Sequence, residues 1–130
     1  MGDLQSGQVL SGTRQDVDVI VGVEQSGVVC LSVMSIRNGQ NTGSRQYLHR
    51  PRLDESLAQV VEAFLPQYYL VRRIPREIVV APAVTSAQAI VDFLAEQCGR
   101  QVMIKSKVRS LRARWLETTR ANALDYLARL

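Results

Sequence analysis

Two apolar runs near the start of the chain, both rich in β-branched residues, constrain its fold most. The first is VDVIVGV (Val17 to Val23), the second is VVCLSVMSIR (Val28 to Arg37), and a short segment of turn composition separates them. Runs of this kind, bounded by turn residues, are typical of strands. Asn38-Gly39 follows, a pair that tolerates the positive φ angles of a type I′ hairpin turn. With a third strand over about Gln40 to Leu48, the sequence predicts an antiparallel three-stranded meander.

A change of period after Arg50-Pro51 indicates a helix. Apolar residues now recur at i, i+3, i+4, i+7 and i+8, which is the spacing of one face of an α-helix. This spacing predicts an amphipathic helix from about Leu53 to Tyr69, with Asp54 as its N-cap and Pro66 kinking or ending its last turn.

The rest of the chain alternates between strand and helix signals. The expected elements are a strand over Arg76 to Ala81, a helix capped by Thr85 or Ser86 and ended by Gly99, a strand over Gln101 to Lys105, and a helix over about Leu111 to Leu130. The last helix would turn Leu116, Ala123, Leu124, Leu127 and Leu130 inward. Each αβ unit returns the chain parallel to an earlier strand. The prediction is therefore an α/β fold of order βββαβαβα, the element order of the ribonuclease H-like fold, with a mixed five-stranded sheet and helices on its faces.

Length and composition limit the classes of protein that fit. A chain of 130 residues is about one domain, and 46% hydrophobic with 22% charged residues excludes disordered and low-complexity classes. No apolar run approaches the roughly 20 residues that span a bilayer, and no secretory signal is visible. Cys30 and Cys98 are too few for a disulfide framework and favour a reducing, cytoplasmic location. We expect residues 1–15 to be a tail or the end of an upstream linker, and residues 16–130 to be the domain.

Positive charge concentrates toward the end of the chain. There are 16 Lys and Arg against 12 Asp and Glu, a net charge of +4. Between Gln97 and Leu116 every charged residue is basic: Arg100, Lys105, Lys107, Arg109, Arg112 and Arg114. Such a field favours a polyanion such as a DNA backbone, whereas the plainer interpretation is a solvated helix face. Trp115 could stack on a base, and Arg37 could contact phosphate beside the hairpin turn, but core packing and ordinary hairpin chemistry are the interpretations we favour.

Active ribonuclease H-like nucleases hold two divalent cations with carboxylates from the first strand, the first helix, the end of the fourth strand and the last helix. The acids of this chain on those elements are Asp16, Asp18, Glu55, Glu62, Glu117 and Asp125. The fourth strand, however, ends Val80-Ala81-Pro82-Ala83, without an acid. We therefore predict no catalytic residue, metal ion or other cofactor in this sheet. Asp16 and Asp18 point to one face of a strand and should form a water-exposed charge pair, with a weak metal site as the alternative.

No other sequence motif indicates a catalytic, metal-binding or nucleotide-binding site. His49 is the only histidine, and no Cys, Ser or carboxylate motif near it indicates a triad or a zinc site. The sequence contains no P-loop, no G-x-G-x-x-G and no C-x-x-C. Nucleotide-binding loops and zinc modules are thereby excluded.

Five strings, in order along the chain, resemble the central region of the UvrC family. They are VDVI at 17–20, RNGQNTGSRQYL at 37–48, EAFLPQYY at 62–69, PREIVV at 75–80 and NALDYL at 122–127. UvrC is the incision subunit of the bacterial UvrABC nucleotide excision repair system. The resemblance implies a non-catalytic ribonuclease H-like domain between a helical hairpin that contacts UvrB and the catalytic endonuclease domain.

The resemblance also implies a role. The domain would be a monomer without membrane contact that positions the nuclease halves of its parent protein on UvrB and damaged DNA, and touches the DNA backbone through the basic stretch. One departure falls in that stretch, because the family commonly has a Pro-x-Arg-Gly turn where this chain has KSKVRS at Lys105 to Ser110. Two alternatives remain open: a metal-dependent nuclease using Asp16, Asp18 and a helix carboxylate, and a spacer that binds only protein.

Overall fold

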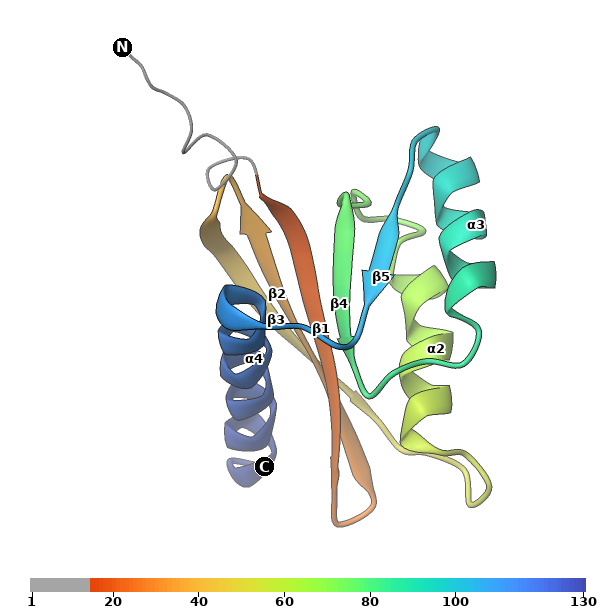
Figure 1. Cartoon of the computed structure of the whole chain (residues 1–130). Helices are drawn as coiled ribbons and strands as arrows, with labels where there is room; N and C mark the ends of the chain where they lie inside the picture. Colours follow the sequence, from red (N-terminus) through yellow and green to blue (C-terminus); the bar gives the residue numbers. More distant parts are fainter. Residues whose placement is uncertain (1–14) are drawn as a thin grey trace.

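A mixed five-stranded sheet runs through the computed structural model, which describes residues 15–130 (Figure 1). The strands are β1 (Asp16–Gln25), β2 (Val28–Arg37), β3 (Gln40–His49), β4 (Glu77–Ala81) and β5 (Met103–Lys105). Their spatial order is β3-β2-β1-β4-β5, with β1 to β3 antiparallel, β4 parallel to β1, and β5 parallel to β4. The predicted α/β class, mixed sheet and element order are confirmed. Of the predicted tail at 1–15, only Gln15 belongs to the described residues.

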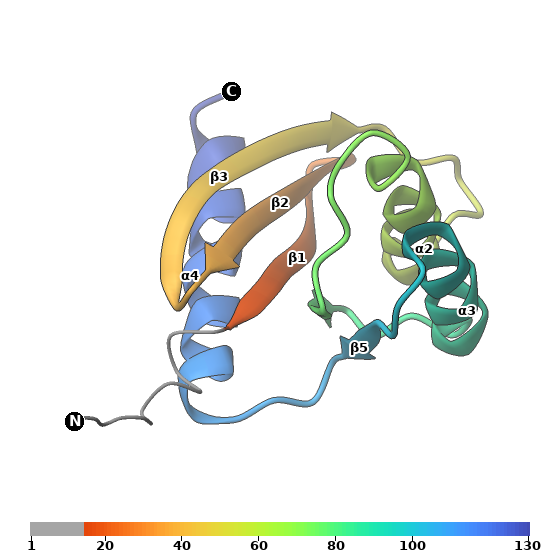
Figure 2. The ribbon, with the colours of Figure 1, turned by 90° about the horizontal axis from the view of Figure 1, so that it is seen from above.

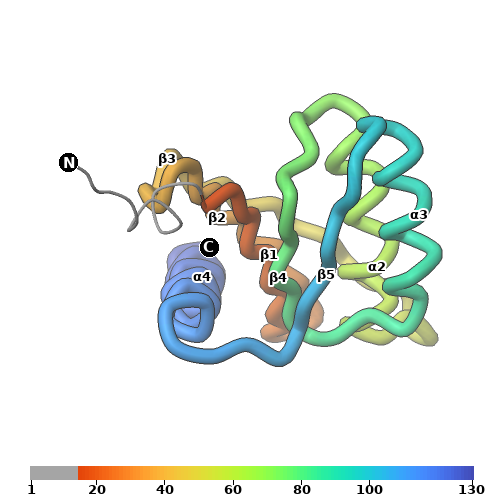
Figure 3. The backbone as a smooth tube through the Cα atoms, turned by 45° about the horizontal axis from the view of Figure 1, so that its top comes forward, coloured from red at the N-terminus to blue at the C-terminus, as the bar shows by residue number. Residues whose placement is uncertain are grey.

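Helices cover both faces of this sheet. They are α2 (Leu57–Tyr68), α3 (Ala87–Cys98) and α4 (Ser110–Ala128). α4 packs along β1 and β2 on one face, while α2 packs on β1 from the other face, with α3 beside α2 and β5 (Figures 2 and 3). Within residues 15–130, no helix combines the length and apolar character that crossing a membrane requires.

Two tight turns set the register of the meander. Ser26-Gly27 and Asn38-Gly39 have positive φ angles of 53 to 77°, the pattern of type I′ turns whose twist matches that of the strands. β1 and β2 therefore pair along their whole length. The β2–β3 ladder has one bulge, at which Thr42 leaves the register and its hydroxyl donates a hydrogen bond to the Ser35 carbonyl oxygen at 3.2 Å.

Side-chain alternation along β1 gives the sheet two cores. Val17, Val19 and Val21 pack on the α4 side, whereas Ile20 packs on the side of α2 and α3. A strand buried on both faces needs apolar residues at nearly every position, which explains why the first run of the sequence shows little alternation. Each fully buried aliphatic side chain stabilises the fold by about 1.5–3 kcal/mol.

α2 begins at Leu57 rather than at about Leu53, and its N-cap lies two residues later than predicted. Ser56, not Asp54, is the N-cap: its Oγ accepts a hydrogen bond from the Gln59 amide at 3.1 Å, and the Gln59 side chain accepts one from the Ser56 amide at 2.7 Å. This reciprocal capping box requires Gln or Glu three residues after the cap, which Asp54 lacks. Pro66 lies inside the helix, which continues to Tyr68.

The other helix ends follow the predictions more closely. Gly99 ends α3 in the left-handed conformation, with φ 74°. On α4, Thr119, Ala123 and Leu127 are buried at successive i, i+4 positions. Leu124 and Leu130 are 44% and 69% exposed, so their predicted inward orientation is wrong. Leu124 is displaced by one residue, or about 100° around the helix, from the buried stripe.

Candidate functional site

Asp16 and Asp18, the two acids at the start of β1, are not a water-exposed pair. Asp18 is 1% exposed. The Tyr69 hydroxyl donates a hydrogen bond to its Oδ2 at 2.5 Å, and Nη2 of Arg37 lies 3.0 Å from its Oδ1 as an ion-pair contact. The expectation of exposure is wrong because the segment after α2 folds over the start of β1 and supplies these acids with partners.

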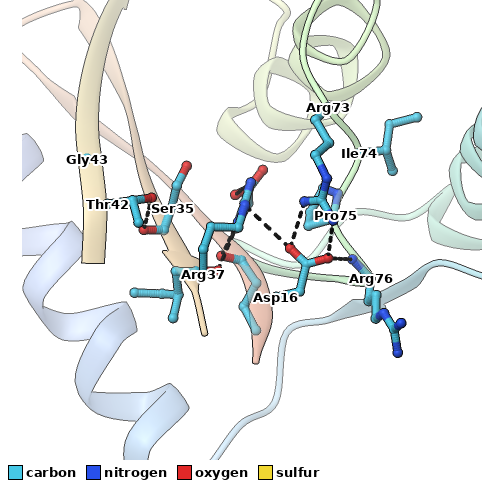
Figure 4. Close-up of polar contacts among 12 residues, drawn as sticks. Asp16, Ser35, Arg37, Thr42, Gly43, Arg73, Ile74, Pro75 and Arg76 are labelled. Atoms are coloured by element: carbon cyan, nitrogen blue, oxygen red, sulfur yellow. Dashed lines mark hydrogen bonds and ion pairs between the residues drawn. The ribbon is translucent and has the colours of Figure 1, made fainter. Parts of the chain in front are cut away.

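Asp16 is held by arginines from two directions (Figure 4). Both its oxygens accept hydrogen bonds from the Arg73 guanidinium, at 2.9 and 2.8 Å, and the Arg76 amide donates to Oδ2 at 3.3 Å. Nε of Arg37 lies 3.4 Å from Oδ1. Partial burial opposes ionisation of Asp16, but the hydrogen bonds and charge of Arg73, with the charge of Arg37, outweigh it and lower the pKa of this carboxyl.

Arg37, the last residue of β2, also anchors the backbone beside it. Its Nη1 donates hydrogen bonds to the carbonyl oxygens of Val17 at 3.2 Å and Ile36 at 2.9 Å. Because Arg37 is the ladder partner of Asp16, the hairpin register places the cation directly opposite the acid. The guanidinium is thus fixed in one orientation between two carboxylates.

β1, β4 and β5 start at the same end of the sheet, at the top of Figure 1. Residues at this end line two clefts, which share Arg76. One, of about 450 Å³, is lined by Gln15, Asp16, Arg37, Asn38, Arg73 and Arg76. The other, of about 370 Å³, is lined by Arg76, Arg100, Gln101 and Met103. Arg100 donates hydrogen bonds to the carbonyl oxygens of Ile74 and, at 3.3 Å, Pro75. Arg76 therefore stands between two clefts that are lined mainly by polar side chains.

The remaining candidate carboxylates make structural contacts elsewhere. Glu62 on α2 accepts hydrogen bonds from the Ser86 amide at 2.7 Å and the Thr85 hydroxyl at 3.2 Å, so it caps α3 in place of the Ser86 side chain. Hydrogen bonds from Ser86 and Thr85 lower the pKa of Glu62. Glu55 accepts hydrogen bonds from the Arg52 amide at 3.1 Å and lies 3.1 Å from Nε2 of His49.

The two acids of α4 pair with an arginine of the same helix and with the arginine that follows it as C-cap. Glu117 lies 3.6 Å from Arg120, and Asp125 lies 3.1 Å from Arg129. In the part of the chain that the structure describes, no group of three or more His, Cys, Asp or Glu side chains is placed to hold a metal ion. The candidate acids are therefore distributed over the molecule rather than brought together.

Ligands of parallel sheets usually bind at the carboxyl ends of the strands. Glu24, near the end of β1, is the one acid at that end of β1 and β4, and it is exposed. Gly22, two residues before Glu24 on the same face of β1, is covered by α2, and β4 ends at Ala81. A Cβ atom on Gly22 would lie 2.7 Å from Cγ2 of Val61 and 3.3 Å from Cδ1 of Leu57. α2 thus packs directly on the strand and leaves no room for a side chain. Asp16 and Asp18 lie at the opposite end of the same face.

The predicted basic stretch is not a single surface. Arg112 donates two hydrogen bonds to Glu77 at 2.6 and 2.8 Å, and Nζ of Lys105 lies 3.7 Å from the same carboxylate. Burial opposes ionisation of Glu77, but Arg112 and Lys105 together lower its pKa. Arg100 lines the smaller of the two strand-start clefts. The residues left exposed, without a carboxylate partner among residues 15–130, are Lys107, Arg109 and Arg114.

Comparison with known proteins identifies the family. The UvrC Ribonuclease H-like domain family matches residues 16–130. The chain belongs to this family. It is 36% identical over 124 residues to UvrABC system protein C of Edwardsiella ictaluri, covering 92% of this chain and 20% of that protein. The corresponding protein of Methylococcus capsulatus is 35% identical over 116 residues, covering 89% and 19%. That of Pseudomonas syringae pv. tomato is 33% identical over 128 residues, covering 96% and 21%.

The chain spans about a fifth of the length of these curated relatives. Among solved structures, a Bacteroides thetaiotaomicron protein with an actin-like ATPase fold aligns with a TM-score of 0.37 and 10% identity, covering 83% of this chain and 40% of that one. That likeness is too weak to support an inference.

Ser110, the first residue of α4, has an unusual backbone conformation in this UvrC ribonuclease H-like domain. Its φ of 54° lies in the left-handed region, which favours glycine. Trp115, one turn further along α4, packs against the α4-side core, as the core interpretation predicted. The Arg112 guanidinium lies 6.0 Å from the centre of its ring.

Sequence reasoning missed the arginines of the segment between α2 and β4 in this UvrC ribonuclease H-like domain. Arg72, Arg73 and Arg76 lie within five residues of one another, and two of them line the strand-start clefts. Their local density was a usable signal of a second basic surface. Their proximity to Arg37 and Arg100 depends on the fold and could not be read from local sequence.

Proposed function

We propose that this chain is a non-catalytic ribonuclease H-like domain of a UvrC subunit. In this proposal it acts as a scaffold that positions the nuclease domains of that subunit on UvrB and damaged DNA in the cytoplasm. The observation that carries the proposal is the use of Asp16, Asp18, Glu55 and Glu62 in structural hydrogen bonds and ion pairs.

Two-metal nuclease chemistry requires several carboxylates whose oxygens are free to coordinate cations a few ångströms apart. Here Arg37 and Arg73 occupy the cation positions beside Asp16 and Asp18. A bound Mg²⁺ would have to displace these guanidinium groups and remain close to them. The carboxyl ends of β1 and β4 offer a single exposed acid, Glu24, which is too few carboxylates to hold two cations, and this supports the scaffold over the nuclease.

A nicking assay with supercoiled plasmid tests the proposal directly. We expect no Mg²⁺- or Mn²⁺-dependent nicking above the buffer background, and no saturable Mn²⁺ binding by electron paramagnetic resonance. Asp16→Asn and Asp18→Asn serve as matched variants, with circular dichroism to verify that each is folded. Nicking by the wild-type chain that both folded variants lose would overturn the proposal in favour of a metal-dependent nuclease.

A contact with the DNA backbone through α4 is the second part of the proposal. Lys107, Arg109 and Arg114 are exposed near the start of this helix and make no ion pair within the described residues. Replacing all three by Gln should weaken duplex binding in fluorescence anisotropy and flatten its salt dependence. If the same replacements leave both binding and incision by the assembled UvrABC system unchanged, a spacer that binds only protein is the better description.

A further inference from the structure

A second cationic surface lies at the strand-start edge, apart from α4. We call it the arginine edge and define it as Arg37, Arg73, Arg76 and Arg100, which line the two clefts. Asp16 and Asp18 are the acids that contact it. Four guanidinium groups against two carboxylates leave a net charge of about +2 on one end of the sheet.

The acids at this edge orient the arginines more than they neutralise the surface. Asp18 is buried, and Asp16 holds Arg73 by two hydrogen bonds while the Arg73 side chain remains 59% exposed. Arg100 is held by backbone carbonyl oxygens, which leave its charge uncompensated. Cations fixed in this way lose little side-chain entropy when they bind an anion.

Unlike Arg37, Arg73 and Arg100, Arg76 has a guanidinium without a hydrogen-bond or ion-pair partner among residues 15–130. Its backbone amide is tied to Asp16, which fixes the start of the side chain. The side chain is exposed and lines both clefts. It is therefore a free cation at the junction of two adjoining anion-sized spaces.

We propose that the arginine edge binds the sugar-phosphate backbone of a nucleic acid strand, with successive phosphates in the two clefts and Arg76 between them. Planar guanidinium groups bind phosphate oxygens through paired hydrogen bonds. Asn38 and Gln101, one in each cleft, add neutral donors. This surface goes beyond the α4 contact of the proposed function and does not depend on it.

The lining of the clefts favours a nucleic acid over an acidic protein. Protein interfaces usually place an aromatic or aliphatic anchor in a desolvated pocket. The larger cleft is lined only by polar and charged residues, and the smaller one has Met103 as its single apolar lining residue. Several cations without an apolar anchor favour a nucleic acid backbone, because it carries one negative charge on each nucleotide.

Salt-dependent binding of the full chain to a labelled oligonucleotide duplex tests the inference. The slope of log K against log salt is negative, and its magnitude should fall by about 0.9 for each phosphate contact removed. Binding should weaken by about tenfold per contact near 50 mM salt. We expect this effect from Arg76→Gln and twice the slope change from Arg73→Gln/Arg76→Gln. Arg76→Lys keeps the charge and should keep most of the slope. Arg129→Gln, at the far end of α4, should leave the slope unchanged.

Four results would overturn the inference. The double variant could bind with the wild-type slope, the Lys107, Arg109 and Arg114 triple variant alone could lose binding, or polyglutamate at equal ionic strength could compete as well as the oligonucleotide. The second result would refute the arginine edge and leave the α4 contact standing. Equal competition by inorganic phosphate would reduce the edge to a general anion site and would also refute backbone recognition. Thermal unfolding of every variant verifies that it is folded.

Discussion

At the scale of single residues, the buried carboxylate of Asp18 determines how the start of β1 is covered. A buried charge is costly unless hydrogen bonds and a counter-charge compensate it. The Tyr69 hydroxyl, at the end of α2, supplies the hydrogen bond. Arg37, at the end of β2, supplies the counter-charge. The acid therefore joins three parts of the chain that are distant in sequence.

Replacing Tyr69 by Phe should destabilise the protein by about 1–3 kcal/mol, because the change leaves one oxygen of a buried carboxylate without its donor. Urea unfolding measures the loss. Tyr68→Phe is the matched control: Tyr68 is also buried, but its hydroxyl makes no hydrogen bond within the described residues, and its loss should cost less than about 0.5 kcal/mol. Equal effects of the two changes would show that the hydroxyl of Tyr69 contributes nothing specific.

At the scale of elements, the Glu77–Arg112 pair fastens α4 to the start of β4. The folded-state pKa of Glu77 is lowered from its ordinary value of 4.5. A lowered pKa means that the folded protein binds its proton less readily than the unfolded chain. The resulting stability is fully present above about pH 4.5 and is lost as the pH falls through the lowered folded value.

Glu77→Gln should therefore lower the free energy of unfolding at pH 7 by about 2 kcal/mol, and the difference from wild type should shrink toward pH 3. Urea unfolding at a series of pH values measures this difference. Glu96→Gln, an exposed position on α3, should follow the wild-type pH profile. A difference that stays constant from pH 7 to 3 would mean that Glu77 acts through packing rather than through its charge.

The start of α4 offers a substitution that should increase the stability of the protein. Ser110 holds a positive φ of 54°, which costs a non-glycine residue about 1–2 kcal/mol. Ser110→Gly removes this strain but gives the unfolded chain more freedom. We expect a net gain in stability of up to about 1 kcal/mol by thermal unfolding, and a loss on Ser110→Val, whose β-branched side chain fits this conformation poorly. A gain with Val would contradict the assignment of strain.

The sequence could predict the features that depend on neighbouring residues, but not the contacts between residues that are distant along the chain. Local signals placed the hairpin at Asn38-Gly39 and the end of α3 at Gly99, because turn and cap geometry depend on neighbouring residues. The burial of Asp18 was missed because Tyr69 lies 51 residues away. The Glu77–Arg112 contact likewise spans 35 residues and depends on how the crossover returns α4 to the sheet. Partners of this kind are set by the tertiary fold.

At the scale of the whole molecule, one sheet serves two cores. β1 contributes Val19 to the α4 side and Ile20 to the other, so neither core can open without exposing the central strand. Within the described residues, α4 is the element that covers the β1–β2 face from its side. The two cores are therefore expected to unfold as one cooperative unit.

Trp115 makes this cooperativity measurable, because the only tryptophan of the chain lies against the α4-side core. Urea unfolding followed by its fluorescence should coincide with unfolding followed by circular dichroism, which reports all elements. Leu127→Ala, at a position 8% exposed, should shift both curves equally by about 2–4 kcal/mol. Leu124→Ala, three residues earlier and 44% exposed, should shift them by less than about 1 kcal/mol. If Leu127→Ala moves the fluorescence transition alone, α4 detaches independently, and the sheet keeps its other core without it.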